Sequence, residues 1–466
     1  MRKCRWSSLF LAVLVMVLLA APAAAESADV VIVGAGGAGL AAAIEAADQG
    51  VSVVVLEKMP MVGGNTLYAT GGMNAAGTSS QEALGIEDSP AVHYEDTIQG
   101  GNDLNVPELV EIMTSQAPAA VEWLKGLGAD LDDVGRLGGS SVNRTHRPTG
   151  GQAVGPHLVQ VMFEAAQDRG VEFRLESQAV EILRNEDGAA YGVVVDNRDG
   201  TYTITAKAIV VTTGGFGANP TMFVEYDPEL EGFGTTNAPS ATGDGIAMLT
   251  EVGAQLIHMD QIQTHPTVHP GRSTMITEAV RGNGAIMVSR DGTRFVDEMG
   301  TRDVVSTAIL EQEGQSAYLL FDDSIRASLA AIENYRRQGI VTEADTLEAL
   351  ASELGIDAST LTAAVEQYNA SAAEGVDEAF GRSDLPRSLT EAPFFAVEVG
   401  PAVHHTMGGV VINGDTEVQG SEGSIPGLFA AGELTGGVHG GNRLGGNALA
   451  DIVVFGRIAG QHAAQF

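Results

Sequence analysis

Cysteine is almost absent from this chain of 466 residues, and the only one is Cys4. A single thiol excludes a disulfide within the chain, a thiolate metal site, an iron–sulfur cluster and a C-x-x-C-H haem attachment. Any redox chemistry in this protein must therefore use a cofactor that does not depend on cysteine.

Lysine is also scarce, occurring only at positions 3, 58, 125 and 207, and the formal net charge is −35. So acidic a chain is disfavoured as a ligand of nucleic acid or of anionic membranes. A solvated acidic surface is the simplest explanation of this charge, and a dedicated partner-binding patch is the alternative.

The first 25 residues have the pattern of a secretory signal peptide. Three basic residues precede an apolar run at residues 9–20, and small residues fill positions 21–25. The run is shorter than the roughly 20 residues that a membrane-spanning helix needs, and no twin arginine is present. We therefore expect export by the general secretory route, cleavage near Ala25, a periplasmic mature protein and no stable membrane anchor.

Glycine, by contrast, is abundant, and the mature sequence opens on a glycine-rich turn. An apolar strand is predicted at residues 29–33, followed by G-x-G-x-x-G at residues 34–39, an alanine-rich helix at 40–49 and a second strand at 51–56 that ends at Glu57. This order is typical of the first unit of a dinucleotide-binding Rossmann-like α/β fold.

Each part of the motif has a physical purpose. Gly34 permits the tight turn, Gly36 lets the backbone approach a pyrophosphate, and Gly39 lets the helix pack on the strand. The helix N-terminus favours the phosphate charge, and an acidic residue about 20 positions on, here Glu57, holds the ribose hydroxyls. The motif alone does not separate NAD from FAD.

Later segments return to the same fold. An antiparallel meander is predicted over residues 171–207, and a buried strand at 208–211 leads to Gly214. Near the end, a strand at 427–433 finishes on Glu433, and a helix begins at Asn447 and runs to about residue 460. The start of that helix is expected to stabilise the anion of a reduced cofactor.

The stretch between these segments differs in character, with scattered histidines and arginines and helical patterns at residues 324–337, 346–354 and 359–375. We interpret residues 260–403 as an inserted α+β capping domain, and residues 26–259 and 404–466 as the FAD-binding domain.

Five separated segments carry basic or hydroxyl groups that core packing does not require, at residues 263–267, 275–282, 301–303, 404–409 and 441–447. With the second glycine-rich loop at residues 58–73, they make the chain resemble the soluble periplasmic fumarate reductase flavoproteins, including the flavin portion of flavocytochrome c. The resemblance spans nearly all of the mature chain and identifies the cofactor as FAD.

The resemblance implies which residues contact the cofactor. Residues 63–74 contain no histidine, which in this family indicates noncovalent FAD. No metal site is predicted from side chains, although family members can hold sodium with backbone oxygens. The expected cofactor contacts are Gly34, Gly36, Ala38, Gly39, Glu57, Lys58, Gly64, Asn65, Thr66, Gly71, Gly72, Gly214, Asp244, His405, Glu433, Asn447, Ala448 and Leu449.

The resemblance also implies a dicarboxylate clamp. His404 and Arg443 match the residues that hold one substrate carboxylate, and His265, Thr277 and the backbone of Glu278 match those that hold the other. Gly446 is a further substrate-binding position. Arginine suits this work because its planar fork pairs bidentately with a carboxylate.

By the same resemblance, Arg302 is the proton donor to the substrate carbon opposite the hydride, and Glu278 and Arg281 form the relay that re-protonates it. Without the resemblance to the family, Arg302 and Asp303 are interpreted as a surface ion pair. Glu278 and Arg281 are then interpreted as an exposed helical pair, and His265, beside a proline, as a turn residue.

These residues predict reduction of fumarate to succinate, as in anaerobic respiration, with electrons from a separate cytochrome c. Reduction of another enoate, such as methacrylate, urocanate or an arylacrylate, is the first alternative. A flavin electron carrier without a substrate is the second, although the cap and Arg302 would then have no purpose.

Overall fold

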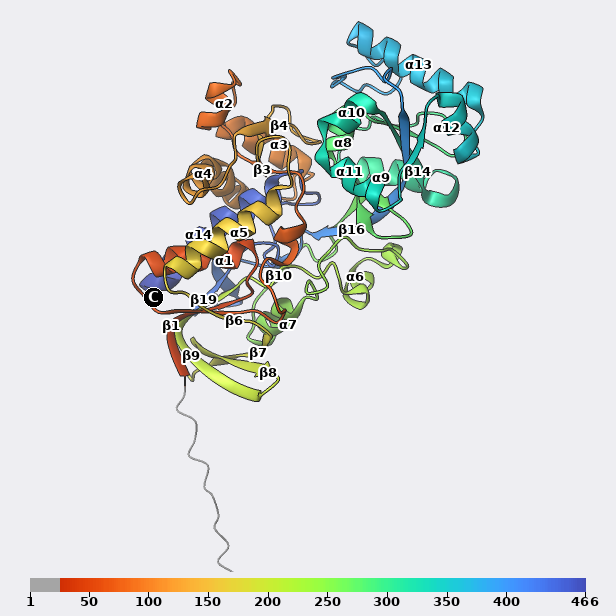
Figure 1. The fold of residues 1–466 in the computed structure, drawn as a ribbon. Helices are drawn as coiled ribbons and strands as arrows, with labels where there is room; N and C mark the ends of the chain where they lie inside the picture. The colour runs from red at the N-terminus through yellow and green to blue at the C-terminus, as the bar shows by residue number, and fades with distance from the viewer. Residues whose placement is uncertain (1–25) are drawn as a thin grey trace, which may run out of the picture.

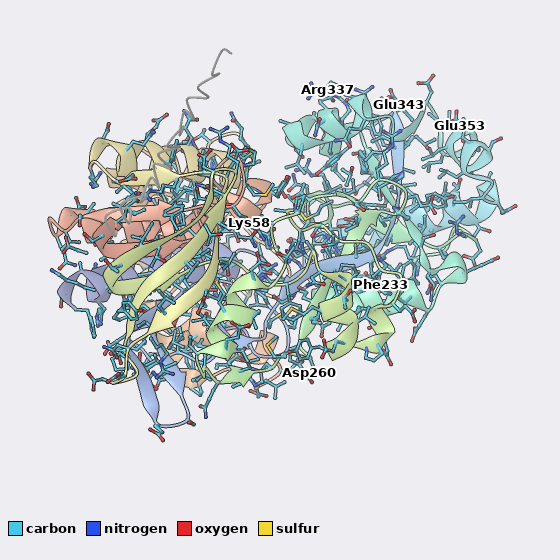
Figure 2. The ribbon with its side chains drawn as sticks, turned by 90° about the horizontal axis from the view of Figure 1, so that it is seen from below. Lys58, Phe233, Asp260, Arg337, Glu343 and Glu353 are labelled. Atoms are coloured by element: carbon cyan, nitrogen blue, oxygen red, sulfur yellow. The ribbon has the colours of Figure 1, made fainter. Side chains whose placement is uncertain are left out.

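The computed structural model describes residues 26–466, which form two lobes of unequal size (Figure 1). The export signal predicted at residues 1–25 lies outside the described residues. One hydrophobic core draws on residues 28–259 and 403–463, and a second, smaller core lies within residues 276–399. Seen from below, Lys58 lies in the larger lobe, and Arg337, Glu343 and Glu353 lie in the smaller one (Figure 2).

The larger lobe is centred on a sheet in which β19, β9, β1, β2 and β6 lie side by side and parallel. These strands are Gly423–Ala430, Gly200–Val211, Glu26–Val33, Val53–Leu56 and Glu172–Arg174. The last four residues of β1 are all buried, as expected of a strand with helices on both faces. The predicted Rossmann-like fold is confirmed.

The meander predicted over residues 171–207 is shorter than expected. β7 (Ser177–Arg184), β8 (Ala190–Asn197) and the first half of β9 form it, whereas β6 pairs parallel with β2. Phe173 of β6 packs against the main core. The edge strand β18 (Glu417–Gly420) pairs antiparallel with β19.

Two helices from opposite ends of the chain pack together beside the sheet, α1 (Gly37–Asp48) and α14 (Asn447–Gln465) (Figure 1). Their contact is close because α14 carries glycine where a side chain would collide with α1. A Cβ at Gly456 would lie 2.6 Å from the Ala38 carbonyl oxygen, and one at Gly460 would lie 2.2 Å from that of Ala42.

Further elements of the larger lobe are short or lie outside the main sheet. The helices are α2 (Ser79–Ala83), α3 (Pro90–Gly100), α4 (Pro107–Gly126), α5 (Val154–Asp168), α6 (Pro220–Tyr226) and α7 (Asp244–Glu251), with 3-10 turns at Gly64–Tyr68 and Pro228–Leu230. The strands are β3 (Met73–Asn74), β4 (Asp133–Gly135), β5 (Thr145–Arg147), β10 (Leu256–Ile257) and β17 (Gly409–Val410). In the described part of the chain, no helix combines the length and apolar character needed to cross a bilayer.

The smaller lobe has its own antiparallel sheet in the order β12, β11, β16, β14, β13, with β15 also on β16. These strands are Thr274–Met275, Ile262–His269, Phe394–Thr406, Ala317–Asp322, Ile286–Val288 and Thr342–Ala344. Its helices are α8 (Ala279–Gly282), α9 (Arg302–Leu310), α10 (Asp323–Ser328), α11 (Ala330–Arg337), α12 (Leu347–Leu354) and α13 (Ala358–Glu374), with a 3-10 turn at Glu313–Gln315.

The helical pattern at residues 324–337 corresponds to two helices, α10 and α11. They are separated at Leu329, whose φ of −138° and ψ of 107° are extended. Leu329 is buried in the small core, so packing of its side chain compensates the break in the helix.

The long strand β16 connects the small lobe to the cavity described below. Its residues 394–399 pair with β14, and its later residues pair with β11 as far as Thr406. The strand thereby carries His404 and His405 out of the small lobe toward the nucleotide sheet.

Candidate active site

A cavity that opens to solvent runs from the carboxyl ends of the parallel strands to the seam between the lobes. It begins at Val33 and Leu56, the last residues of β1 and β2, and reaches His265 and Thr277 in the small lobe. Ligands of open α/β sheets bind at this edge. The predicted cofactor positions that line it are Gly34, Gly36, Ala38, Glu57, Lys58, Gly64, Asn65, Thr66, Gly71, Gly72, Gly214, Asp244, His405, Glu433, Ala448 and Leu449.

The glycine loops leave a cradle in the wall of this cavity. A Cβ at Gly214 would meet no atom within 4 Å, and at Gly36 and Gly64 the nearest atoms lie 4.0 Å and 3.9 Å away. Gly34 has a φ of 105°, a backbone conformation in which a residue with a side chain would be strained. The open wall at the start of α1 fits a pyrophosphate held by backbone N–H groups and a helix N-terminus.

Two of the predicted cofactor positions, Gly39 and Asn447, do not line the cavity. A Cβ at Gly39 would lie 2.0 Å from the Gly34 carbonyl oxygen, so this glycine permits helix–strand packing. The Asn447 side chain points into the protein, where it accepts a hydrogen bond from Asn74 (2.8 Å) and contacts Nε2 of His93 (2.9 Å).

Glu57 and Asp244 are both held by neighbouring groups. Glu57 accepts hydrogen bonds from the backbone N–H groups of Ala35 and Met59, both at 2.9 Å, and so fixes the first glycine loop. Lys58 lies 2.7 Å from Asp244. Burial would raise the pKa of Asp244, but the bonds from Lys58 and Thr242 lower it.

At the other end of the cavity, two arginines converge on one glutamine. Arg302 donates to the side-chain amide oxygen of Gln263 (Oε1) at 3.1 Å, and Arg443 donates to the same oxygen at 3.2 Å. Gln263 begins the segment at residues 263–267 but is not among the predicted site residues. Its position two residues before His265 on a strand places both side chains on one face, and that spacing is the signal that identifies it.

The histidines His265 and His404 lie against each other, with ring centroids 4.9 Å apart. Thr236 is within hydrogen-bonding distance of Nδ1 of His404, at 2.7 Å. Burial, reinforced by the positive charge of Arg302, holds the pKa of each ring well below its usual range. Both rings are therefore neutral at pH 7 and can donate one N–H each to an anion.

The predicted relay is a buried ion-pair chain. Arg302 donates from Nε to Oε2 of Glu278 at 2.9 Å, and Nη2 of Arg281 lies 3.6 Å from the same oxygen. Burial would raise the pKa of Glu278, but the positive charges of Arg302 and Arg281 lower it. Arg281 is fully buried and does not line the cavity, so it reaches the site only through Glu278.

These positions exclude the alternative interpretations, in which these residues lie on the surface or in a turn. Arg302 is 8% exposed and pairs with Glu278 rather than forming a surface pair with Asp303. Glu278 and Arg281 are 4% and 0% exposed, and His265 lies within β11 rather than in a turn. Thr277 and Gly446 also line the cavity.

Comparisons with known proteins identify the family of the chain. The family described as FAD binding domain matches residues 29–449. The chain is 49% identical over 443 residues to a protein named fumarate reductase (cytochrome) from Shewanella frigidimarina, which covers 95% of this chain and 78% of that protein. The chain belongs to the fumarate reductase flavoprotein family.

Two further proteins are similar to the chain over most of its length. An open conformation of a flavocytochrome c3 fumarate reductase superposes with a TM-score of 0.79 at 45% identity, covering 94% of this chain and 78% of that one. A protein named NADH:fumarate oxidoreductase from Klebsiella pneumoniae (strain 342) is 46% identical over 95% of this chain, which spans 48% of that protein.

Membership in the fumarate reductase flavoprotein family makes the chain an FAD-dependent oxidoreductase and confirms FAD, the cofactor that the resemblance implied. The open glycine cradle in the cavity wall fits that cofactor independently of the comparisons.

Proposed function

We propose that this protein reduces the carbon–carbon double bond of an unsaturated dicarboxylate, fumarate, to give succinate. The observation that carries the proposal is the charge of the site. Arg302 and Arg281 share one carboxylate within ion-pair distance, that of Glu278, and Arg443 has none within that distance among the described residues. The positive charge of this cluster exceeds the negative charge of Glu278, which favours a dianionic ligand such as fumarate.

This surplus is costly without a ligand. Burial, followed by repulsion from Arg302, lowers the pKa of Arg443 to about 9. In a chain with a net charge of −35, a buried positive cluster of this kind favours an anionic ligand. We assign one substrate carboxylate to Arg443 and His404, and the other to His265, Thr277 and the Glu278 backbone.

FAD, held noncovalently by the glycine loops, supplies a hydride at flavin N5 when it is bound. Arg302 holds a proton at the edge of the cavity and delivers it to the other alkene carbon, so that two electrons and two hydrogens are added. Glu278 then returns a proton to Arg302, and Arg281 supplies Glu278. Burial of Arg302 and Glu278 strengthens these charge interactions.

We propose that electrons come from a separate cytochrome c in the periplasm, after export and removal of residues 1–25. If the donor is a basic cytochrome, the acidic surface steers it, and the rate of flavin reduction by that cytochrome falls as salt rises. A rate that does not change with ionic strength contradicts electrostatic steering.

The test is anaerobic oxidation of reduced viologen by the FAD-loaded protein with fumarate, methacrylate, urocanate and cinnamate in parallel. Fast turnover on fumarate alone supports the dicarboxylate clamp. Turnover on a monocarboxylate alone overturns the roles of His265 and Thr277, and silence on all four substrates favours an electron carrier.

A further inference from the structure

The side chain of Glu278 is held from both lobes. Its Oε2 accepts from Arg302, which begins α9 in the small lobe. Its Oε1 accepts from the backbone N–H of Gly138 at 2.5 Å, and Gly138 belongs to a loop of the large lobe, 140 residues away in sequence. Each carboxylate oxygen thus has its own donor.

The loop at residues 136–141 has no regular structure to keep Gly138 in place. It is fixed instead by Asp96 of α3, which accepts from both the backbone N–H and the hydroxyl of Ser141, each at 2.8 Å. Beside it, a Cβ at Gly139 would lie 2.4 Å from Leu444, the neighbour of Arg443. The loop therefore lies directly between α3 and the substrate-binding segment.

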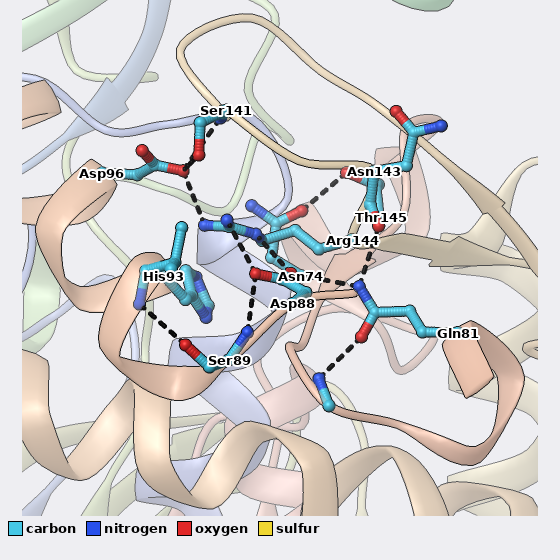
Figure 3. Close-up of polar contacts among 12 residues, drawn as sticks. Asn74, Gln81, Asp88, Ser89, His93, Asp96, Ser141, Asn143, Arg144 and Thr145 are labelled. Atoms are coloured by element: carbon cyan, nitrogen blue, oxygen red, sulfur yellow. Dashed lines mark hydrogen bonds and ion pairs between the residues drawn. The ribbon is translucent and has the colours of Figure 1, made fainter. Parts of the chain in front are cut away.

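Asp96 is held in turn by Arg144, which is completely buried (Figure 3). Arg144 lies 2.8 Å from Asp96 and makes a forked contact to Asp88 through Nε (3.0 Å) and Nη2 (3.1 Å). A buried guanidinium with two carboxylates is costly to assemble and strongly destabilising to break, so its geometry is well fixed.

The same buried network reaches the substrate-binding segment on its other side. Thr145, next to Arg144, donates to Asn74 at 2.6 Å, and Asn74 donates to the Gly445 carbonyl oxygen at 2.8 Å. The network shown in Figure 3 thus braces both the loop that contacts Glu278 and the segment that carries Arg443.

We propose that Arg144, with Asp88 and Asp96, is a positioning residue for proton delivery. It fixes the loop so that the Gly138 N–H holds Oε1 of Glu278 and leaves Oε2 directed at Arg302. This inference rests on the proposed function, in which Glu278 returns the proton to Arg302. A charge-assisted bond to one carboxylate oxygen restricts rotation of the group and so orients the other oxygen.

The test uses Gly138→Ala in the FAD-loaded protein, because a Cβ at Gly138 would lie 2.8 Å from Oε1 of Glu278. We expect kcat for fumarate to fall, but by less than the roughly 10²-fold or more that a positioned proton-transfer group contributes. KM and FAD content stay unchanged, and the D₂O effect on kcat increases. The acid limb of the pH profile moves upward, because the Gly138 N–H helps to lower the pKa of Glu278.

Gly135→Ala is the matched control, since its Cβ would meet only the movable end of Arg147, at 3.0 Å. If Gly138→Ala shows the same D₂O effect and the same pH profile as this control, the inference is overturned.

Asp96→Asn is the second variant, in case Gly138→Ala does not retain FAD. It keeps the shape of the side chain and weakens its pairing with Arg144, and an upward shift of the acid limb is again expected. An unchanged pH profile in Asp96→Asn overturns the inference. If the wild-type protein reduces no enoate, the proposed function fails and the inference falls with it, whereas active wild type with unaffected variants removes the inference alone.

Discussion

Replacing Arg302 by alanine tests whether this residue delivers the proton. Arg302 makes two contacts of 2.9 Å to Glu278, through Nε and Nη2, and one of 3.1 Å to Gln263. General acids contribute about 10²- to 10⁴-fold to rate, equivalent to about 3–5 kcal/mol of barrier. We expect turnover on fumarate to fall by that range in Arg302→Ala.

The same substitution leaves Glu278 with Arg281 at 3.6 Å and the Gly138 N–H. Breaking a buried ion pair costs about 3–5 kcal/mol of stability, and because Arg302 borders the cavity, water entering its place brings the cost to the lower end. FAD binding survives, because Arg302 lies at the opposite end of the cavity from the glycine loops.

The assay is viologen oxidation, with flavin absorbance per polypeptide measured on the same samples. Arg302→Lys is the matched variant, since it keeps the positive charge but loses the planar fork, and we expect it to retain FAD while remaining far slower than wild type. Turnover of Arg302→Ala within tenfold of wild type would refute Arg302 as the acid.

Three further perturbations test other parts of the structure. Gly39→Ala places a Cβ 2.0 Å from the Gly34 carbonyl oxygen, so the purified protein should lack flavin absorbance, whereas Gly126→Ala, with no atom within 4 Å, should keep it. Glu278→Gln removes the carboxylate of the arginine cluster, so kcat should fall about 10²-fold. The affinity for fumarate, measured by titration, should equal or exceed that of the wild type, and weaker binding contradicts the charge argument. Burial lowers the pKa of His93 to about 4, so its contribution to stability is fully present above an unfolded pKa of about 6.5 and is lost at about 1.4 kcal/mol per pH unit as pH falls from there toward 4. Urea unfolding of His93→Gln should show a shallower loss over that window, and an unchanged slope counts against the assignment.

The local features of the chain could be predicted from sequence because their parts are neighbours. The glycine turn, the first strand and helix, and Glu57 all lie within residues 26–57, and their order determines how they pack. The strand β6 could not be placed this way, because three residues pair equally well with a preceding or a following strand until the core selects one.

Prediction of the site residues depended on the resemblance to the family. Arg302 stands next to Asp303 in sequence, yet it pairs with Glu278, 24 residues away, because α9 buries its first residue against the cavity. Gly138 and Arg144 were not predicted at all. Neither a backbone N–H nor a buried guanidinium held by distant carboxylates leaves a periodic pattern in sequence.

The insertion of the small lobe into the large one has a consequence for how the chain is made. β19, which completes the nucleotide sheet, and α14, which packs on α1, leave the ribosome only after the whole of the small lobe. In a nascent chain the small core can fold before the first strands of the larger lobe have all of their neighbouring strands. Those unpaired strands are apolar, so the hazard of aggregation during synthesis is concentrated in the N-terminal half.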